Sequence, residues 1–393
     1  MNKFIPLSVP NFRGNELKYV TEAIETGWVS TGGAFITQFE NKTSDYVKSS
    51  GAVACQSGTA GLHIALMLCG ITREDEVIVP ALTFIAAVNP VRYIGAEPIF
   101  MDCDDSLTLN VVKLKNFCDE ECYFESNKLI NKLTKKHIKA IVIVHIFGNM
   151  ADMEEIMNIA YKYNLKVIED ATEALGTYYT QGKYIGKYAG TVGDIGVYSF
   201  NGNKIITTGG GGMIVSNDEG VLKRAKHLTT QAKNDELYYI HDEVGYNYRM
   251  TNLQAALGLA QIEQLEKFID IKKSNYDLYR QELFDVDGLE ILNFRKDIRS
   301  NYWFYSLLCK NKEHGMNKDE IIRYLSDKNI QSRPIWGLVH EQKPYLNCQV
   351  YKIDKAKFYA DNVVNLPCST NLNKEDIEYI TEYLKNIIRE WLL

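Results

Sequence analysis

A single lysine, Lys204, stands in the segment SFNGNKIITTGGGGMIV, residues 199 to 215, in which no other residue is charged. Burying an unpartnered ammonium group is unfavourable, so such a lysine needs a polar partner, a covalent bond or access to solvent. Access to solvent is the simplest interpretation of this segment taken alone. Covalent chemistry is the alternative, because a lysine amine adds to carbonyl compounds.

Two further stretches carry groups that suit the same chemistry. In LKVIEDATEALG, Glu169 and Asp170 end an apolar strand, where a buried carboxylate needs a charged or protonated partner. In SGTAGLHIALML, Ser57, Gly58 and Thr59 stand at a predicted helix start, whose free N–H groups and dipole favour phosphate. An ordinary helix N-cap is the alternative for this turn.

Pyridoxal phosphate requires all three features together. It bonds to a lysine amine as a Schiff base, it needs a carboxylate that keeps its ring nitrogen protonated, and its phosphate needs an anion-binding turn. The sequence therefore predicts pyridoxal 5′-phosphate as the cofactor. No metal site is predicted, because none of the eight cysteines forms a CxxC pair and no His-x-x-x-His pair lies nearby. We expect reduced, mostly buried thiols.

The run of four glycines, Gly209 to Gly212, is predicted as a tight turn. A dinucleotide-binding loop would open a helix, but the residues that follow, MIVSNDEG, are typical of a strand that ends in a turn. A Walker phosphate loop is excluded, because both Gly-Lys pairs of the chain are followed by tyrosine.

The elements that must position these groups alternate along the chain. Up to about residue 216, short runs rich in Val and Ile alternate with helical patterns, which predicts an α/β fold with a mainly parallel sheet flanked by helices. Ligands of such sheets bind at the carboxyl ends of the strands. A length of 393 residues favours two domains. We predict a large cofactor-binding domain over residues 1–250, N-terminal helix included, and a small C-terminal α+β domain over residues 251–393, linking helix included.

Four segments carry more specific expectations. GNELKYVTEAIETG predicts a helix that ends at Gly27, and MTNLQAALGLAQIEQLEKF predicts one long linking helix. The C-terminal segment predicts a helix with an apolar stripe of Ile377, Ile380, Leu384 and Ile387. The lysine-rich residues 128–139 are predicted as a solvated helix face.

Composition restricts the partners and the location. The net charge is −6 and the basic residues are scattered, which argues against nucleic acid as a partner. No signal peptide and no 18-residue apolar run is recognised, so we expect no membrane association and a cytoplasmic location.

With these segments identified, the chain resembles the fold-type-I, DegT/DnrJ-type aminotransferases, which act on nucleotide-linked keto sugars. The motifs that carry the resemblance are, in chain order, SGTAGLHIAL, PALTFIAAVNPV, VIEDATEALG, SFNGNKIITTGGGGMIV and GYNYRMTNLQAALGLAQ. Two stretches, GNELKYVTEAIETGWVSTGGAFI and EDATEALG, are most similar to the subgroup that makes 4-amino-4,6-dideoxy-N-acetylhexosamines for bacillosamine or legionaminic acid.

The resemblance assigns roles to the residues of these motifs. It implies that Lys204 forms the Schiff base and that Asp170 faces the ring nitrogen. It also implies that Gly58, Thr59 and Ser199 bind the phosphate.

Other residues receive roles that are less specific to their motifs. Phe84 would lie against the cofactor ring, with a place in the core as the alternative. Asn247 would reach the phosphate of the neighbouring subunit, which implies a homodimer with shared active sites. The candidates for substrate contacts are Trp28, Thr31, Arg333 and His340.

Two positions depart from the family's pattern. Gly210 replaces a glutamate that many relatives carry in the glycine turn, and we interpret it as a structural variant. Glu173 stands where many relatives have Gln or His near the cofactor's phenolic oxygen. Because an ionised Glu beside a phenolate raises the energy of both, we expect Glu173 to be protonated, to turn toward substrate or to be offset by another group.

The implied reaction moves an amino group from L-glutamate to C4 of a UDP-linked 4-keto-6-deoxy-N-acetylhexosamine. A GDP-perosamine-type or other nucleotide-sugar aminotransferase is the alternative within the same class. A non-catalytic regulatory or binding protein that keeps the fold is the alternative of a different class.

Overall fold

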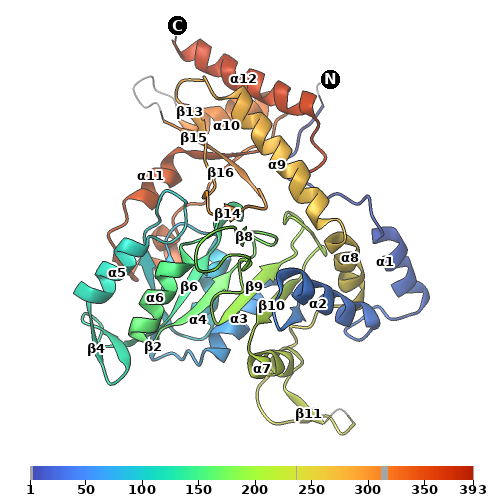
Figure 1. Cartoon of the computed structure of the whole chain (residues 1–393), viewed down its shortest axis with the longest axis vertical. Coiled ribbons are helices and arrows are strands. Elements are labelled where there is room, and N and C mark those ends of the chain that lie inside the picture. Colours follow the sequence, from blue (N-terminus) through green and yellow to red (C-terminus); the bar gives the residue numbers. More distant parts are fainter. Residues whose placement is uncertain (1–2, 236, 311–316, 393) are drawn as a thin grey trace.

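The computed structural model describes residues 3–235, 237–310 and 317–392. A wide lower body carries a narrower upper part, which holds the C-terminal elements (Figure 1). A ten-stranded mixed sheet forms the centre of the lower body, and its main path runs β1–β10–β9–β7–β6–β2–β3–β17. All neighbours from β9 to β17 are parallel, whereas β10 is antiparallel to both of its neighbours. The predicted mainly parallel α/β sheet is therefore confirmed.

The strands of this sheet are short and mostly buried. Along the main path they are β1 (Gly51–Cys55), β10 (Gly212–Ser216), β9 (Ile195–Ser199), β7 (Lys166–Asp170), β6 (His137–Val144), β2 (Asp75–Pro80), β3 (Glu97–Met101) and β17 (Gln349–Tyr351). An antiparallel extension beside β6 is formed by β4 (Cys122–Glu125) and β5 (Lys128–Asn131). The strands are rich in Val and Ile because both faces of the sheet are covered, so side chains on either face are buried.

Helices surround the sheet of the lower body. They are α1 (Glu16–Glu25), α2 (Ala34–Val47), α3 (Gly58–Leu68), α4 (Asn89–Tyr93), α5 (Val111–Glu120), α6 (Met153–Tyr163), α7 (Glu219–Thr229) and α8 (Asn252–Ile262). α3 packs on β1, β7, β9 and β10, and α7 lies beside it. Because α3 is covered on nearly every side, its sequence is mostly apolar rather than amphipathic.

The upper part is built around the long helix α9 (Leu265–Glu282) and a four-stranded antiparallel sheet (Figure 1). Its strands are β13 (Leu289–Ile291), β15 (Tyr305–Cys309), β18 (Val363–Leu366) and β16 (Arg333–Pro334), and its helices are α10 (Lys318–Asp327), α11 (Lys355–Asn362) and α12 (Lys374–Leu392). The predicted apolar stripe of α12 is confirmed, since its four members, Ile377, Ile380, Leu384 and Ile387, are buried.

The C-terminal segment also contributes to the lower body. β17 adds a parallel strand to the edge of the large sheet beside β3, and β14 (Ile298–Arg299) pairs with β8 (Tyr178–Tyr179). α8 packs against α1 and α2. Elements from both sides of residue 250 are thus interleaved, and the domain boundary stays a prediction.

Two expectations about local structure are wrong. The lysine-rich residues 128–139 form β5 and the start of β6 instead of a helix, since Leu129 and Ile138 are both buried in the sheet. The linking helix is interrupted between α8 and α9. The break lets α8 stay on the lower body while α9 rises into the upper part (Figure 1). The helix that we predicted to end at Gly27 does so, with that residue at φ 75°.

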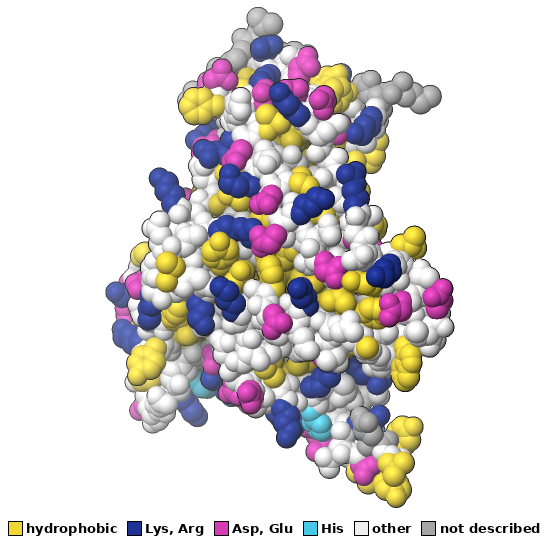
Figure 2. Space-filling model, turned by 45° about the vertical axis from the view of Figure 1, so that its right-hand side comes forward, with side chains coloured by type: hydrophobic (Ala, Val, Ile, Leu, Met, Phe, Trp, Pro, Cys, Tyr) yellow, Lys and Arg dark blue, Asp and Glu magenta, His cyan; other side chains and the backbone are white. Residues whose placement is uncertain are grey.

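A long arm leaves the lower body after α7. It contains the short antiparallel strands β11 (Lys233–Asp235) and β12 (Ile240–His241), and it projects at the bottom of the molecule (Figure 1). Its large side chains are exposed, namely Leu237, Tyr238, Tyr239, Ile240 and Val244. In Figure 2 the lower end of the molecule shows a matching group of hydrophobic side chains.

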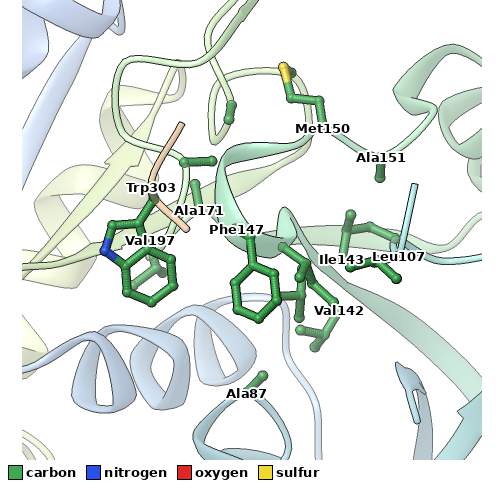
Figure 3. Close-up of a cluster of buried hydrophobic side chains, with 14 of the residues drawn as sticks. Ala87, Leu107, Val142, Ile143, Phe147, Met150, Ala151, Ala171, Val197 and Trp303 are labelled. Atoms are coloured by element: carbon green, nitrogen blue, oxygen red, sulfur yellow. The ribbon is translucent and has the colours of Figure 1, made fainter. Parts of the chain in front are cut away.

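The main core runs through both parts of the protein. Figure 3 shows the section of it where Phe147 and Trp303, from distant segments, lie near Val142, Ala171 and Val197 of the sheet region. The eight cysteines are unpaired and all but one are buried, as expected. Among the described residues, no helix combines the length and the apolar character that a membrane crossing requires.

Candidate active site

The turn between β1 and α3 offers N–H groups to an anion. Ser57 caps α3, because its Oγ accepts a hydrogen bond of 3.1 Å from an N–H of the first turn. Gly58 and Thr59 open the helix, where N–H groups have no partner within the helix. A Cβ built on Gly58 would lie 2.9 Å from Cβ of Ser199 and 3.0 Å from Cγ2 of Thr172. A side chain at position 58 would therefore collide with these two residues, and glycine lets the turn keep its present conformation.

Lys204 lies in the loop between β9 and β10, and its side chain is 13% exposed. Its Nζ is 3.5 Å from Oε1 of Glu173 and 4.2 Å from the centre of the Trp303 ring. The lysine is thus partnered by a carboxylate and an indole face rather than by bulk solvent. The simple interpretation of a lysine that points to solvent is wrong.

The two carboxylates at the end of β7 serve different surroundings, because successive side chains of a strand point to opposite faces. Glu169 accepts a hydrogen bond of 2.8 Å from His145 and further bonds from the N–H groups of Gly190, Val192 and Gly193. Burial favours the neutral acid, but these donors outweigh it and lower the pKa of Glu169. Glu169 is therefore a structural carboxylate, and protein groups donate hydrogen bonds to both of its oxygens.

Asp170 occupies the other face and borders a cavity. Its Oδ1 accepts a hydrogen bond of 3.1 Å from the N–H of Thr172. Burial raises the pKa of Asp170, against the opposing effects of Thr172 and Lys204. A protonated ring nitrogen of a ligand would supply the charged partner that this carboxylate needs.

Glu173 is buried and held on both of its oxygens. Oε1 faces Lys204, and Oε2 accepts a hydrogen bond of 2.9 Å from the N–H of Phe147. Burial raises the pKa of Glu173 to about 7, while Lys204 and the Phe147 N–H oppose the rise and Asp170 adds to it. We expected Glu173 to be protonated, to turn toward substrate or to be offset by another group. The structure shows Lys204 as a group that offsets its charge, and a pKa of about 7 at which the carboxyl is partly protonated near neutral pH.

These groups surround one cavity of about 620 Å³. The residues that we singled out from the sequence and that line it are Ser57, Gly58, Thr59, Phe84, Asp170, Glu173, Ser199, Lys204, Gly210 and Arg333. Phe84 is 53% exposed, so it faces this open space instead of filling the core. Arg333 makes no ion pair with any described residue, which leaves its guanidinium available to an anionic ligand.

Four other candidates do not line this cavity. Trp28 is 62% exposed and Thr31 is half-buried in the same loop before α2. Asn247 is exposed beside the arm, where its Oδ1 accepts a hydrogen bond of 3.2 Å from Arg249. The His340 ring packs near Phe100, with the two ring centroids 5.9 Å apart. Their roles stay predictions.

Four aromatic side chains of the cavity wall were not foreseen: Phe147, Trp303, Phe304 and Trp336. The Phe147 ring lies 6.0 Å from Trp303 and 4.8 Å from Trp336, and Figure 3 shows Phe147 and Trp303 approaching the same space. Long-range packing brings them together, so no local motif marks Trp303 or Trp336. For Phe147 a signal exists, since it follows the carboxyl end of a buried strand and precedes a glycine.

The residues present fit pyridoxal phosphate. Three groups border the same cavity. They are the amine of Lys204, the buried carboxylate of Asp170, and the helix-start turn whose N–H groups are left open by the missing side chain of Gly58. Lys204 could bind the aldehyde carbon, Asp170 the ring nitrogen, and the Ser57–Thr59 turn together with Ser199 the phosphate.

Comparisons with known proteins agree with this chemistry. Residues 10–385 match the DegT/DnrJ/EryC1/StrS aminotransferase family. The chain is 39% identical to a GDP-perosamine synthase of Escherichia coli O157:H7 over 380 residues, which are 97% of each chain. It is 36% identical to a GDP-perosamine synthase of Caulobacter vibrioides, with 98% of each chain covered. A solved DegT DnrJ EryC1 StrS aminotransferase from Brucella abortus superposes with a TM-score of 0.85 at 25% identity, over 95% of each chain.

Proposed function

Because the chain belongs to the DegT/DnrJ/EryC1/StrS aminotransferase family, we propose that it transfers an amino group from L-glutamate to C4 of a nucleotide-linked 4-keto-6-deoxy sugar. It is a pyridoxal phosphate-dependent sugar aminotransferase of fold type I. The observation that carries the proposal is the convergence of Lys204, Asp170 and the Gly58 turn on one cavity.

Each of these residues has a distinct task in the proposed reaction. When bound, pyridoxal phosphate supplies an aldehyde that takes up the amino group and a ring that accepts the electrons released at the donor's α-carbon. Lys204 holds the cofactor covalently until the amino donor displaces it. The freed amine of Lys204 then moves a proton between the donor's α-carbon and C4′ of the cofactor. In the second half of the reaction Lys204 returns that proton in the opposite direction, toward the sugar's C4.

Asp170 and the phosphate turn keep the cofactor in a reactive orientation. The Asp170 carboxylate would hold a proton on the ring nitrogen, because its burial strengthens its attraction for a charged partner. Ser57, Gly58, Thr59 and Ser199 bind the phosphate. Phe84, which is exposed and lines the cavity, would lie against the ring.

Arg333 is our candidate for the anionic part of a substrate. It lines the cavity from β16 of the upper part, and its guanidinium has no carboxylate partner among the described residues. A carboxylate of glutamate or a diphosphate oxygen of the sugar nucleotide would satisfy it.

The nucleotide and the C2 substituent of the sugar are the finer part of the proposal. The similarity to two GDP-perosamine synthases favours a GDP-linked sugar without an acetamido group. The motifs GNELKYVTEAIETGWVSTGGAFI and EDATEALG favour the UDP-linked N-acetyl sugar instead. We therefore keep both, with the GDP-linked sugar first.

Incubation with L-glutamate and each keto sugar nucleotide distinguishes the two. We expect formation of 2-oxoglutarate, measured with a coupled dehydrogenase, together with an amino sugar identified by mass spectrometry. Turnover of only the UDP-linked N-acetyl sugar would reverse the order of the two candidates. No turnover with either, by protein that holds its cofactor, would contradict the proposed reaction.

We further propose that two chains form the active enzyme. Asn247 lies outside the cavity of its own chain, although the resemblance assigns it to a phosphate. The arm that precedes it exposes Leu237, Tyr238, Tyr239, Ile240 and Val244, a large apolar surface for a free chain. A second copy would cover this surface and bring Asn247 to the phosphate turn of its partner.

A further inference from the structure

We infer that Glu173 and Trp303 form a holding site for the amine of Lys204 whenever that amine is not bonded to the cofactor. This inference rests on the proposed function, in which Lys204 is released in the first half of the reaction and bonds to the cofactor again only at the end of the second half. Its direct evidence is the position of the free lysine, with Nζ 3.5 Å from Oε1 of Glu173 and 4.2 Å from the centre of the Trp303 ring.

The two holding groups act on an ammonium in complementary ways. A carboxylate within ion-pair distance attracts it by charge, and an indole face attracts it through the negative potential above the ring. Both attractions are stronger here than at a surface, because Glu173 and Trp303 are 4% and 2% exposed. A lysine has four rotatable side-chain bonds, so without such partners the released amine would occupy many positions.

Glu173 is itself fixed by an unusual backbone conformation. Phe147 donates its N–H to Oε2 of Glu173 at 2.9 Å while it adopts φ 56° and ψ 19°. This left-handed conformation is uncommon for an aromatic residue and persists only where the surroundings impose it. The N–H of Phe147 therefore leaves Oε1 as the oxygen that faces Lys204.

Trp303 is fixed at both of its ends. Its indole N–H donates to the carbonyl of Asn203, the residue before Lys204, at 2.8 Å. Its own carbonyl accepts a hydrogen bond of 3.0 Å from the buried Lys272 of α9, which also donates to the carbonyl of Cys368 at 2.6 Å. The indole is thus tied to the loop that carries Lys204 and to the helix that rises into the upper part.

A holding site has a mechanistic consequence. A released amine that stays at one position meets the donor's α-carbon and C4′ from a constant direction, which preserves the geometry that proton transfer needs. Glu173 and Trp303 are positioning residues in this sense, since they act through Lys204.

The full-length chain, freed of cofactor, provides the first test. Lysines are acylated with an N-hydroxysuccinimide ester, and the labelling rate of Lys204 is followed by mass spectrometry. Glu173→Gln keeps the size and a hydrogen-bonding oxygen but removes the charge, so we expect about tenfold faster labelling at pH 8. Trp303→Phe, which weakens the ring's attraction and loses the bond to Asn203, should label several-fold faster.

The pH dependence separates a holding role from general loosening. The groups that face Glu173 are the Lys204 amine, the Asp170 carboxyl and the Phe147 N–H. Because the pKa of Glu173 is raised to about 7, its charge is present above that pH and lost below it. The ratio of the Glu173→Gln rate to the wild-type rate should therefore fall from about ten at pH 8 toward one at pH 6. The corresponding ratio for Trp303→Phe should not change, since an indole does not titrate.

Lys310 provides the control within the same samples. It pairs with Glu290 at the surface, so its labelling should stay constant in both variants, and Glu290→Gln should affect Lys310 but not Lys204. A Glu173→Gln rate within twofold of wild type at pH 8, or a ratio that is equal at pH 6 and pH 8, would overturn the inference. This measurement uses no cofactor and no sugar, so its failure is distinct from failure of the proposed reaction.

Turnover provides the second test. In the loaded enzyme, Trp303→Phe should lower kcat several-fold with the KM for the keto sugar nucleotide unchanged, because the residue positions a proton carrier and not the sugar. An unchanged kcat would remove the holding site from the reaction.

Discussion

Glu169 and Asp170 are consecutive residues of β7, yet four protein donors surround the carboxylate of Glu169, whereas that of Asp170 borders the cavity. The sequence places both at the same strand end. The alternation of side chains along the strand gives them separate functions, which can be measured separately.

Glu169→Gln should destabilise the fold by about 3 kcal/mol, since an NH2 group replaces one of the two acceptor oxygens and faces the buried N–H of Gly190 or those of Val192 and Gly193, which then lack an acceptor. The stabilising effect of the wild-type carboxylate also depends on pH. The pKa of Glu169 is lowered in the fold, so its contribution is present above about pH 4.3, the ordinary value of a free glutamate, and is lost as the pH falls through the folded-state pKa. Thermal unfolding followed by circular dichroism between pH 3 and pH 7 checks both effects. A variant as stable as wild type would show that the network is not needed for folding.

Asp170→Asn should keep the fold and the cofactor but lower kcat by about 100-fold or more, because an amide does not hold a proton on the ring nitrogen. Steady-state kinetics gives kcat, and the absorbance spectrum of the purified variant reports whether cofactor is bound. The comparison with Glu169→Gln is informative: the first variant should affect turnover and the second stability. Equal kcat values for wild type and Asp170→Asn would exclude this carboxylate from the reaction.

Lys204→Ala should abolish turnover and the visible absorbance of covalently held cofactor, because no other described lysine lines the cavity. The fold should remain, because Lys204 stands in a loop and its partner Glu173 keeps the hydrogen bond from the N–H of Phe147. In the wild type, reduction with borohydride followed by peptide mass spectrometry should locate the pyridoxyl group on Lys204. Its location on any other residue would refute the proposed attachment.

Gly58→Ala should weaken cofactor binding about tenfold or more, because the added methyl group would lie 2.9 Å from Cβ of Ser199 and 3.0 Å from Cγ2 of Thr172. Spectrophotometric titration of cofactor-free protein with pyridoxal phosphate measures the Kd. Gly202→Ala is the matched control, since a Cβ there meets no atom within 4 Å and the loop is the one that carries Lys204. Similar Kd values for the two variants would contradict a phosphate-binding role for the Gly58 turn.

Mixing two inactive variants tests the shared active site. Lys204→Ala and Asn247→Asp should each be nearly inactive alone, the second because an aspartate repels phosphate. Co-refolded or exchanged chains should regain about a quarter of wild-type activity, since half of the dimers are mixed and each mixed dimer has one intact site. Mixtures that stay inactive, although light scattering shows dimers, would contradict a shared site.

Most of the fold could be predicted from the sequence, because the residues that mark its strands and helix ends act locally. Runs of Val and Ile mark the buried strands, Ser57 marks the start of α3, and Gly27 marks the end of α1. The prediction for the lysine-rich residues 128–139 was wrong because their charge suggested a solvated helix. The alternating burial of Leu129 and its neighbours is typical of a strand.

Some of the residues that line the cavity could be predicted from the sequence, for a similar reason. Parallel strands that end at one edge of a sheet bring Gly58, Asp170 and Lys204 together, so short motifs were sufficient to find them. Trp303 and Trp336 come from the C-terminal part and reach the cavity only through tertiary packing. Trp28, Thr31 and Asn247 do not line the cavity of their own chain. A sequence motif gives their residue types but not their positions relative to the cavity.

The parallel pairing of β17 with β3 has a consequence for biosynthesis. On the ribosome, β3 emerges long before residues 349–351 exist, so a nascent chain displays an open, apolar sheet edge until translation is nearly complete. Chains that terminate prematurely before this point keep that edge uncovered, and we expect them to be recognised by chaperones or degraded rather than to accumulate as folded fragments.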